Sequence, residues 1–432
     1  MIEIIKSSDK RRLAERLERI RSRNVALDFE LMSQVAAIIN DVCRRGDAAL
    51  VDYTRQFDGC SIQTSDLRVS EQSLVTAASK ADPVFLDAIR EAIQRIRRFH
   101  EQEREYSWQK ESPNGVRFGQ RIAPIESAGL YVPGGTASYP SSVVMNVIPA
   151  QVAGVSRVVV ATPPRSLQEN PAVAAALVEL GVTEVYAVGG AQAIAALAFG
   201  TETVPRVDKV TGPGNKYVAA AKKLVFGSVG IDSLAGPTEV IILAQASANA
   251  SYVVSDLLAQ SEHSPDASAM LITDSEALAV QVASELRLQT TTLPRREIIQ
   301  KSLSDYGAII IVSDIEEGCN LVNELAPEHL EILCADEDVV ASKIRNAGAI
   351  FFGEHTPEAT GDYLAGPNHV LPTSGTARFS SALGVYDFLK RTTILKFSSG
   401  ELKRTAPLIA ALARAEGLEA HARSALIRTE AE

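Results

Sequence analysis

The stretch VVVATPPRSLQENPAVAAALVELGVTEVYAVGGAQAIAALAFG, residues 158–200, decides the fold. It contains an apolar run at 158–162, a segment of helical period at 171–180, a second apolar run at 184–188 and a second helical segment at 191–199. Apolar runs of this length predict buried strands, and their alternation with helices predicts a parallel sheet with crossover helices.

The same rhythm continues on both sides of this stretch. It starts upstream at AGLYV (128–132) and ends downstream at DKVT (208–211). A second unit follows from Glu239, with strands expected at 240–243, 269–273, 308–312, 329–333 and 349–352 and helices at 248–261, 275–287, 315–325 and 337–346. Outside the two α/β units the pattern predicts helices at 8–22, 29–50, 83–105, 383–390, 400–414 and 418–428.

Composition narrows the class of protein. The chain has 432 residues, 46% of them hydrophobic, and a formal charge of −10. An acidic chain is a poor partner for nucleic acid or an anionic membrane, and no uncharged apolar stretch approaches 20 residues. The charged N-terminal segment is unlike a secretory signal. We therefore expect a cytoplasmic protein with free thiols at Cys43, Cys60, Cys319 and Cys334.

Three glycine-rich turns stand where a predicted strand gives way to a helix. They are YVPGG (131–135), VGGAQA (188–193) and TGPGN (211–215), and the fingerprint G-x-G-x-x-G is absent. A single turn of this kind is commonly only a conformational joint. Three of them in one α/β unit favour a nucleotide cleft, because backbone N–H groups at helix starts bind phosphates.

Candidate chemistry lies in four short segments of the second half. Gln260 and His263 are three residues apart in an expected helix and offer an oxygen and a nitrogen to a borderline metal such as zinc, although such pairs also arise by chance. Glu328 and His329 are adjacent before an expected strand, which suits acid/base work or an ordinary solvated pair. Two further carboxylate–histidine pairs, one in a glycine-rich loop and one in the tail, are Asp362 with His369 and Glu416 with His421.

Taken in order and spacing, ten segments resemble the histidinol dehydrogenase family over nearly the whole chain. They are YTRQFDG (53–59), YVPGG (131–135), VGGAQAIAALAFGTE (188–202), GPGNKYV (212–218), AGPTEV (235–240), DLLAQSEHSPD (256–266), APEHLE (326–331), GDYLAGPNHVLPT (361–373), ALGVYDFLKR (382–391) and EGLEAHARS (416–424). Thr238 is a departure, because the family commonly has Ser there. Since the hydroxyl is kept, we expect the contact to survive in a tighter pocket.

The resemblance implies a role for each matching residue. It implies zinc ligands at Gln260, His263, Asp362 and His421, an acid/base pair at Glu328 and His329, and NAD contacts at Tyr131, Gln192 and Asn215. It implies substrate contacts at Thr238, Gln260, His263, Glu328, His329, Asp362, His369, Glu416 and His421. The implied reaction is the oxidation of L-histidinol through L-histidinal to L-histidine with two NAD, the zinc acting as a template for the substrate.

The resemblance also implies an architecture. We expect two incomplete Rossmann-like parallel-sheet domains in an intertwined homodimer. The expected parts are an N-terminal helical arm (1–24), a first α/β domain (25–126 with 238–380), an NAD-binding α/β domain (127–237) and a C-terminal helical tail that reaches the partner subunit (381–432). Two rivals stay open, a relative that oxidises another small diol and a non-catalytic metal- or nucleotide-binding protein. The first would have no use for Glu416 and His421, and the second none for Glu328 and His329.

Overall fold

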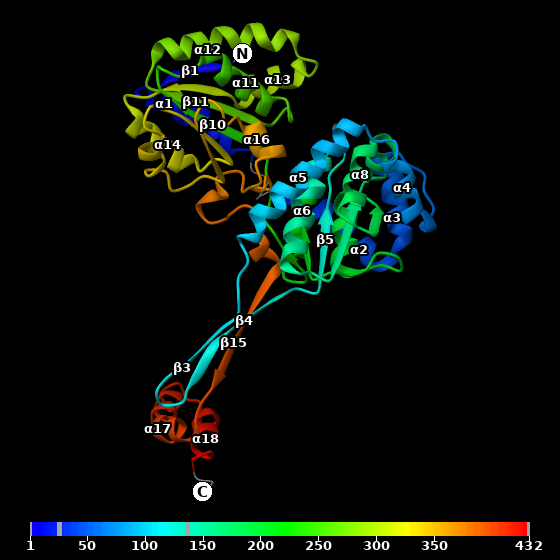
Figure 1. Cartoon of the computed structure of the whole chain (residues 1–432), viewed down its shortest axis with the longest axis vertical. Coiled ribbons are helices and arrows are strands. Elements are labelled where there is room, and N and C mark those ends of the chain that lie inside the picture. Colours follow the sequence, from blue (N-terminus) through cyan, green and yellow to red (C-terminus); the bar gives the residue numbers. More distant parts are fainter. Residues whose placement is uncertain (1, 24–27, 135–138, 430–432) are drawn as a thin grey trace.

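The computed structural model describes residues 2–23, 28–134 and 139–429. Two parallel-stranded lobes and a long antiparallel ribbon make up this part of the chain, and the ribbon projects away from both lobes with two helices at its end (Figure 1). None of the described helices is long and apolar enough to cross a membrane.

The sheet of the first lobe, called sheet A, has the strand order β1-β12-β11-β10-β13-β14, and each neighbouring pair is parallel. Its strands are β1 (Glu3–Lys6), β12 (Ala308–Ile311), β11 (Ser268–Thr273), β10 (Glu239–Ala244), β13 (His329–Leu333) and β14 (Ala349–Phe352). Every residue of β10, β11 and β13 is buried. Burial on both faces explains why these strands read as unbroken apolar runs.

Helices cover both faces of sheet A. Apolar residues of α11 (Ala250–Ser261), α12 (Glu276–Gln289) and α13 (Arg296–Tyr306) form one core. Those of α1 (Lys10–Arg21), α14 (Ile315–Leu325) and α15 (Glu337–Ala341) form the other. The short helix α16 (Glu358–Tyr363) follows the last strand.

The sheet of the second lobe, sheet B, has the order β2-β7-β6-β5-β8-β9, with only β2 antiparallel to its neighbour among the described strands. Its strands are β2 (Arg68–Val69), β7 (Glu184–Ala187), β6 (Arg157–Thr162), β5 (Ser127–Tyr131), β8 (Lys209–Thr211) and β9 (Gly230–Ile231). One face of sheet B is covered by α2 (Phe29–Arg45), α3 (Asp47–Tyr53), α9 (Gly190–Phe199) and α10 (Lys216–Val225). The other face is covered by α4 (Glu71–Ala78), α5 (Pro83–Glu101), α6 (Pro140–Ala153) and α8 (Pro171–Glu179). The short helix α7 (Pro164–Glu169) follows β6.

The ribbon pairs segments that are far apart in the sequence. It has the order β15-β4-β3, formed by β15 (Leu389–Lys396), β4 (Arg117–Pro124) and β3 (Trp108–Glu111), and carries α17 (Ser399–Ala415) and α18 (Glu419–Leu426). Short 3₁₀ turns, η3 to η6, lie at Thr64–Asp66, Thr290–Thr292, Thr376–Arg378 and Val385–Phe388, and a π turn, η2, lies at Thr54–Asp58.

Two α/β units with helices near both ends of the chain confirm the predicted fold class. The N-terminal third, however, is less purely helical than its charge pattern suggested. Residues Glu3–Lys6 form the edge strand β1, whose Ile5 is buried against the sheet. The predicted helix 29–50 is broken at Gly46, whose φ of +54° ends α2 before α3 starts.

The predicted grouping of residues 25–126 with 238–380 is wrong in the structure. Helices α2 and α3 pack in the core of sheet B, as do α4 and α5 on its other face, and β2 pairs with β7 of that sheet. Strands β3 and β4 belong to the ribbon. Hydrophobic periodicity marks the buried face of a helix but does not say which sheet covers it, so this error could not be seen in the sequence.

The C-terminal tail matches the prediction at α17 and α18 and differs before them. The helix expected at 383–390 is instead the turn η6 followed by β15, which pairs with β4 from Leu389 to Lys396. Thr392, Thr393 and Ile394, just after the predicted helix, are β-branched and favour a strand, and pairing with β4 extends this strand back to Leu389.

We predict that Phe388→Ala lowers the free energy of unfolding by about 3–5 kcal/mol, because Phe388 in η6 is 0% exposed and packs in the sheet B core where the ribbon leaves it. Phe226→Ala is the control, since Phe226 is 67% exposed and its loss should cost about 0.5 kcal/mol or less. Urea unfolding of both variants measures the difference, and equal midpoints would show that the ribbon is not anchored there.

Candidate active site

The site begins at the amino-terminal ends of two neighbouring strands of sheet A. Val240 of β10 lies opposite His329, the first residue of β13. This parallel register sets Thr238 and Glu239 beside Glu328 and His329. All four residues therefore gather at one edge of the sheet.

The Glu328 carboxylate is buried and held in place at this edge. Its Oε2 accepts hydrogen bonds from the Thr238 hydroxyl (2.5 Å) and from the backbone N–H of Glu239 (2.9 Å). Burial raises the pKa of Glu328 to about 8, against the lowering effect of these two hydrogen bonds. A carboxylate with a raised pKa is a stronger base when ionised and suits proton transfer near neutral pH.

The His329 ring is held in one orientation by its Nδ1. This atom lies 3.2 Å from the backbone carbonyl of Glu239, so an N–H at Nδ1 donates to that oxygen and leaves Nε2 with a lone pair. Nε2 is buried and has no hydrogen-bond partner among the described residues. Burial lowers the pKa of His329 to about 4, so the ring is neutral at physiological pH and can accept a proton at Nε2.

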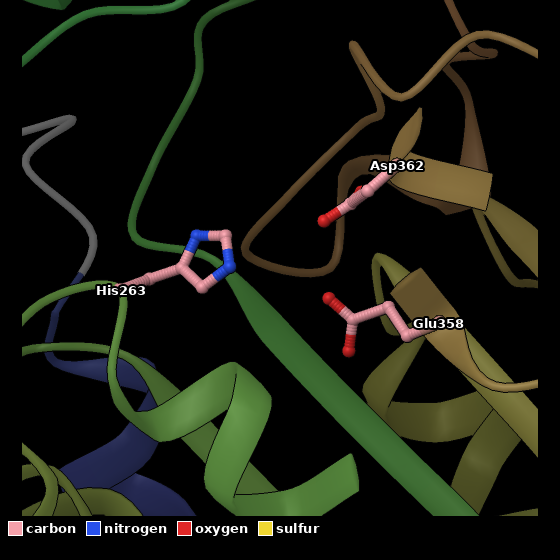
Figure 2. A group of neighbouring side chains, drawn as sticks. All are labelled: His263, Glu358 and Asp362. Atoms are coloured by element: carbon pink, nitrogen blue, oxygen red, sulfur yellow. The ribbon is translucent and has the colours of Figure 1, made fainter. Parts of the chain in front are cut away.

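Three side chains beside this pair form a group that can hold a metal ion. His263, Glu358 and Asp362 each offer one ligand atom, and these atoms lie within 4.8 Å of one another. The carboxylates of Glu358 and Asp362 point from α16 toward the imidazole of His263 (Figure 2). Nitrogen and oxygen donors in this arrangement suit zinc or a similar divalent ion.

The Gln260 side chain connects this group to the acid/base pair. Its amide lies 2.6 Å from Thr238 Oγ1 and 2.8 Å from one oxygen of Glu358. Gln260 is buried near the end of α11, whereas His263 lies just past the helix, which ends at Ser261. Both side chains still reach the same cluster, so the predicted pair is kept although the helix stops short of His263.

The predicted loop 361–373 brings two more predicted residues to the site, although its start, with Asp362, belongs to helix α16. Asp362 Oδ1 lies 3.9 Å from His329 Nε2 and 3.8 Å from His369 Nδ1. Burial lowers the pKa of His369. The loop also touches the other lobe, because Asn368 Nδ2 donates to the carbonyl of Met145 in α6 (2.7 Å). The site thus lies where the two lobes meet.

Sequence reasoning missed Glu358. This carboxyl group is buried, and its Oε1 lies 3.6 Å from His329 Nδ1. Burial and the nearby carboxylates, Asp362 first among them, raise its pKa well above the usual value. The available signal was its spacing of four residues from Asp362, which puts both carboxyl groups on one face of a helix.

Two predicted site residues lie elsewhere in this chain. Both residues are exposed in the tail, Glu416 at the C-terminal end of α17 and His421 in the first turn of α18. Figure 1 shows α18 at the opposite end of the molecule from α16. One chain alone therefore does not bring them to Gln260, His263 and Asp362.

The residues expected to contact a nucleotide lie at the carboxyl ends of sheet B strands. Tyr131 ends β5, and its hydroxyl accepts a hydrogen bond from the N–H of Gly190 (3.1 Å), where φ is +65°. Gln192 is buried in α9, and its Oε1 has no partner among the described residues. Asn215 caps α10 by accepting from the N–H of Tyr217 (3.0 Å). The last glycine of YVPGG lies outside the described residues.

A buried ion pair braces the TGPGN turn. The N–H of Gly212 donates to Asp232 Oδ2 (2.8 Å), and Lys222 Nζ donates to the carbonyl of Gly212 (3.0 Å). Lys222 and Asp232 also form an ion pair, and both side chains are almost fully buried. Gly212 has a φ of +114°, and a Cβ there would collide with the carbonyl oxygen of Tyr131, so the turn requires glycine.

The fold and this site define an α/β enzyme with a buried acid/base pair next to a group able to hold a metal. Comparison with known proteins gives its family. The family model described as histidinol dehydrogenase matches residues 21–429. The chain belongs to the histidinol dehydrogenase family, whose members are oxidoreductases of histidine biosynthesis.

Individual relatives agree over nearly the full length. The chain is 54% identical to the histidinol dehydrogenase of Halalkalibacterium halodurans, covering 92% of this chain and 94% of the relative, and 52% identical to that of Geobacillus kaustophilus, covering 92% and 93%. The crystal structure of histidinol dehydrogenase from Elizabethkingia anophelis superposes with a TM-score of 0.92 at 35% identity, covering 99% of this chain and 98% of that one.

Proposed function

We propose that this chain oxidises L-histidinol through L-histidinal to L-histidine, using two NAD and one zinc ion per site. The observation that carries this proposal is the buried Glu328–His329 pair beside the metal-capable group, in a chain of this family. One base serves each oxidation. An enzyme that only removed hydride from an alcohol would need one base and no group to activate water.

The donor set fits zinc. Gln260, His263 and Asp362 offer two oxygens and one nitrogen, and in our proposal His421 of a second copy completes the set. Two buried ring nitrogens, Nε2 of His329 and of His369, have no hydrogen-bond partner in the described part of the chain and favour a polar occupant at this place. When bound, zinc supplies a template that holds the imidazole and amino nitrogens of the substrate, leaving the alcohol carbon beside the bases.

His329 is the base for the first oxidation in this proposal. Its Nδ1–H is fixed on the Glu239 carbonyl, so Nε2 takes the proton of the substrate hydroxyl as hydride leaves the carbon. Its depressed pKa keeps the ring neutral and ready to accept that proton.

Glu328 is the base for the second oxidation. Its carboxylate, held by Thr238 and the Glu239 N–H, takes a proton from the water that adds to the aldehyde carbon. The product is a gem-diol, whose C–H hydrogen leaves as hydride. No cysteine is needed, because water and not a thiolate adds to the aldehyde.

Sheet B supplies the proposed nucleotide site. Tyr131, Gln192 and Asn215 lie at glycine-rich turns after β5, β7 and β8. The buried Gln192 Oε1 has no partner among the described residues, so it can accept a hydrogen bond from a ligand. When bound, NAD accepts the hydride in each oxidation. The loop 361–373 joins this lobe to the acid/base pair, which supports hydride transfer between the lobes.

The tail supports a shared site in a homodimer. Leu408 and Leu412 of α17 are 59% and 71% exposed, although α17 and α18 share a small apolar cluster of their own. Exposed leucines on a projecting arm suit burial against another protein surface. We infer that this surface is a second copy, and that Glu416 and His421 enter its site while its tail enters this one.

The zinc-loaded protein should form two NADH for each L-histidinol consumed, and chelation should abolish this turnover. With a single anionic ligand from this chain, zinc should be removable while the fold stays intact by circular dichroism, and added zinc should restore activity. Counting NADH against limiting L-histidinol checks the stoichiometry. One NADH per substrate, or full turnover after verified metal removal, would contradict the proposed function.

His329→Asn should reduce turnover of L-histidinol by about 10²–10⁴-fold with little change in substrate binding, because proton transfer contributes that much. Glu328→Gln should impair oxidation of L-histidinal more than that of L-histidinol, since water activation belongs to the second step. Single-turnover assays with each substrate measure the split. His355→Asn is the matched control, as His355 is exposed after β14 and should tolerate the change.

Mixing two inactive variants tests the shared site. When the His263→Ala and His421→Ala variants are folded together, about a quarter of wild-type activity should return. Half of the dimers contain one chain of each variant, and one of the two sites in such a dimer carries neither substitution. If each site is built within one chain, every site carries a lesion and no activity returns even where mixed dimers are present by native mass spectrometry.

A further inference from the structure

Two carboxyl groups lie behind the site and take no part in the mechanism above. Glu331 is buried on β13, and Asp256 on α11 is largely buried. Their carboxyl groups lie close enough to share a hydrogen bond. Glu331 is two residues after His329 on the same strand, so both side chains leave the same face of sheet A. Asp256 is one helical turn before Gln260 and lies on the same face of α11.

Glu331 also holds a third element. Its Oε1 accepts a hydrogen bond from the backbone N–H of Glu358, the first residue of α16 (3.0 Å). Helix α16 carries Asp362 one turn later. A single side chain on β13 therefore binds α11 on one side and the start of α16 on the other.

The hydrogen bonds require a particular protonation state. Two carboxyl groups can bond to each other only when one carries a proton. Burial raises the pKa of both carboxyl groups, because it disfavours their charged forms. With the shared proton on Glu331, this side chain donates to Asp256 and accepts from the N–H of Glu358, and the amide of glutamine offers the same donor and acceptor.

We propose that Glu331 is a positioning residue, whose two hydrogen bonds set the spacing of Gln260, His329 and Asp362. These three residues come from α11, β13 and α16, the three elements that Glu331 joins. Partners in this outer layer commonly decide how tightly a metal is held. The inference rests on the proposed function, because it takes Gln260 and Asp362 as zinc ligands.

The test compares two replacements of similar size. Glu331→Met keeps the volume and removes both hydrogen bonds, so zinc affinity, measured by chelator competition on the metal-free protein, should fall about 10-fold or more. Glu331→Gln keeps a donor for Asp256 and an acceptor for Glu358, and its zinc affinity and turnover should stay within about threefold of wild type. Thr290→Val, which removes a buried hydrogen bond to Leu286 in the same lobe, is the control and should bind zinc normally.

Each outcome decides the matter. Normal zinc affinity in Glu331→Met would reduce the pair to a fold-stabilising contact, and a loss in Glu331→Gln as large as in Glu331→Met would show that the hydrogen bonds are not what matters. If Glu331→Met does not fold, Asp256→Ala replaces it, and its normal zinc affinity would overturn the proposal. Wild-type protein that binds no zinc would overturn the proposed function and this inference together, whereas normal wild-type behaviour with unaffected variants would overturn this inference alone.

Discussion

The parallel pairing of β10 with β13 is the constraint on which the site depends. With Val240 opposite His329, the Glu239 backbone can serve both members of the acid/base pair, its N–H toward Glu328 and its carbonyl toward His329. A shift of the register by one residue would turn the His329 ring to the other face of the sheet. The positions of Glu328 and His329 therefore depend on the backbone of β10 and β13. The unbroken Val, Ile and Leu runs of these strands pack on both faces of sheet A and keep that backbone in place.

Burial shifts the pKa values of the carboxyl groups at the site, and burying their charged forms also costs free energy. Several carboxyl groups gather at one edge of sheet A, and desolvation raises the pKa of Glu328, Glu331 and Glu358. Each of them has hydrogen-bond donors nearby, so none is buried without a partner. In the zinc complex that we propose, the cation at His263 and Asp362 would lower the remaining repulsion between these carboxyl groups further.

Much of the fold and of the site could be predicted from the sequence, and most of the failures concern contacts between distant segments. Local patterns located the chemistry-bearing segments and the strands of both sheets except β1, β2 and β9, because strand period and motif spacing are properties of neighbouring residues. Pairing between distant segments is not such a property. Contacts between distant segments place α2 and α3 on sheet B, add Glu3–Lys6 to sheet A and make 389–396 a strand. Glu358 was missed for the same reason, since only the fold brings it to Gln260.

The ribbon also constrains the order in which the molecule can be made. Strand β4 pairs with β15, and Pro124 meets Leu389 only after the intervening chain has been synthesised. Closing so long a loop is slow, so β4 leaves the ribosome paired with β3 alone, while all strands of sheet B can already be present. The segment that completes the arm also brings Phe388 into the core of sheet B, so the arm and this lobe are completed together.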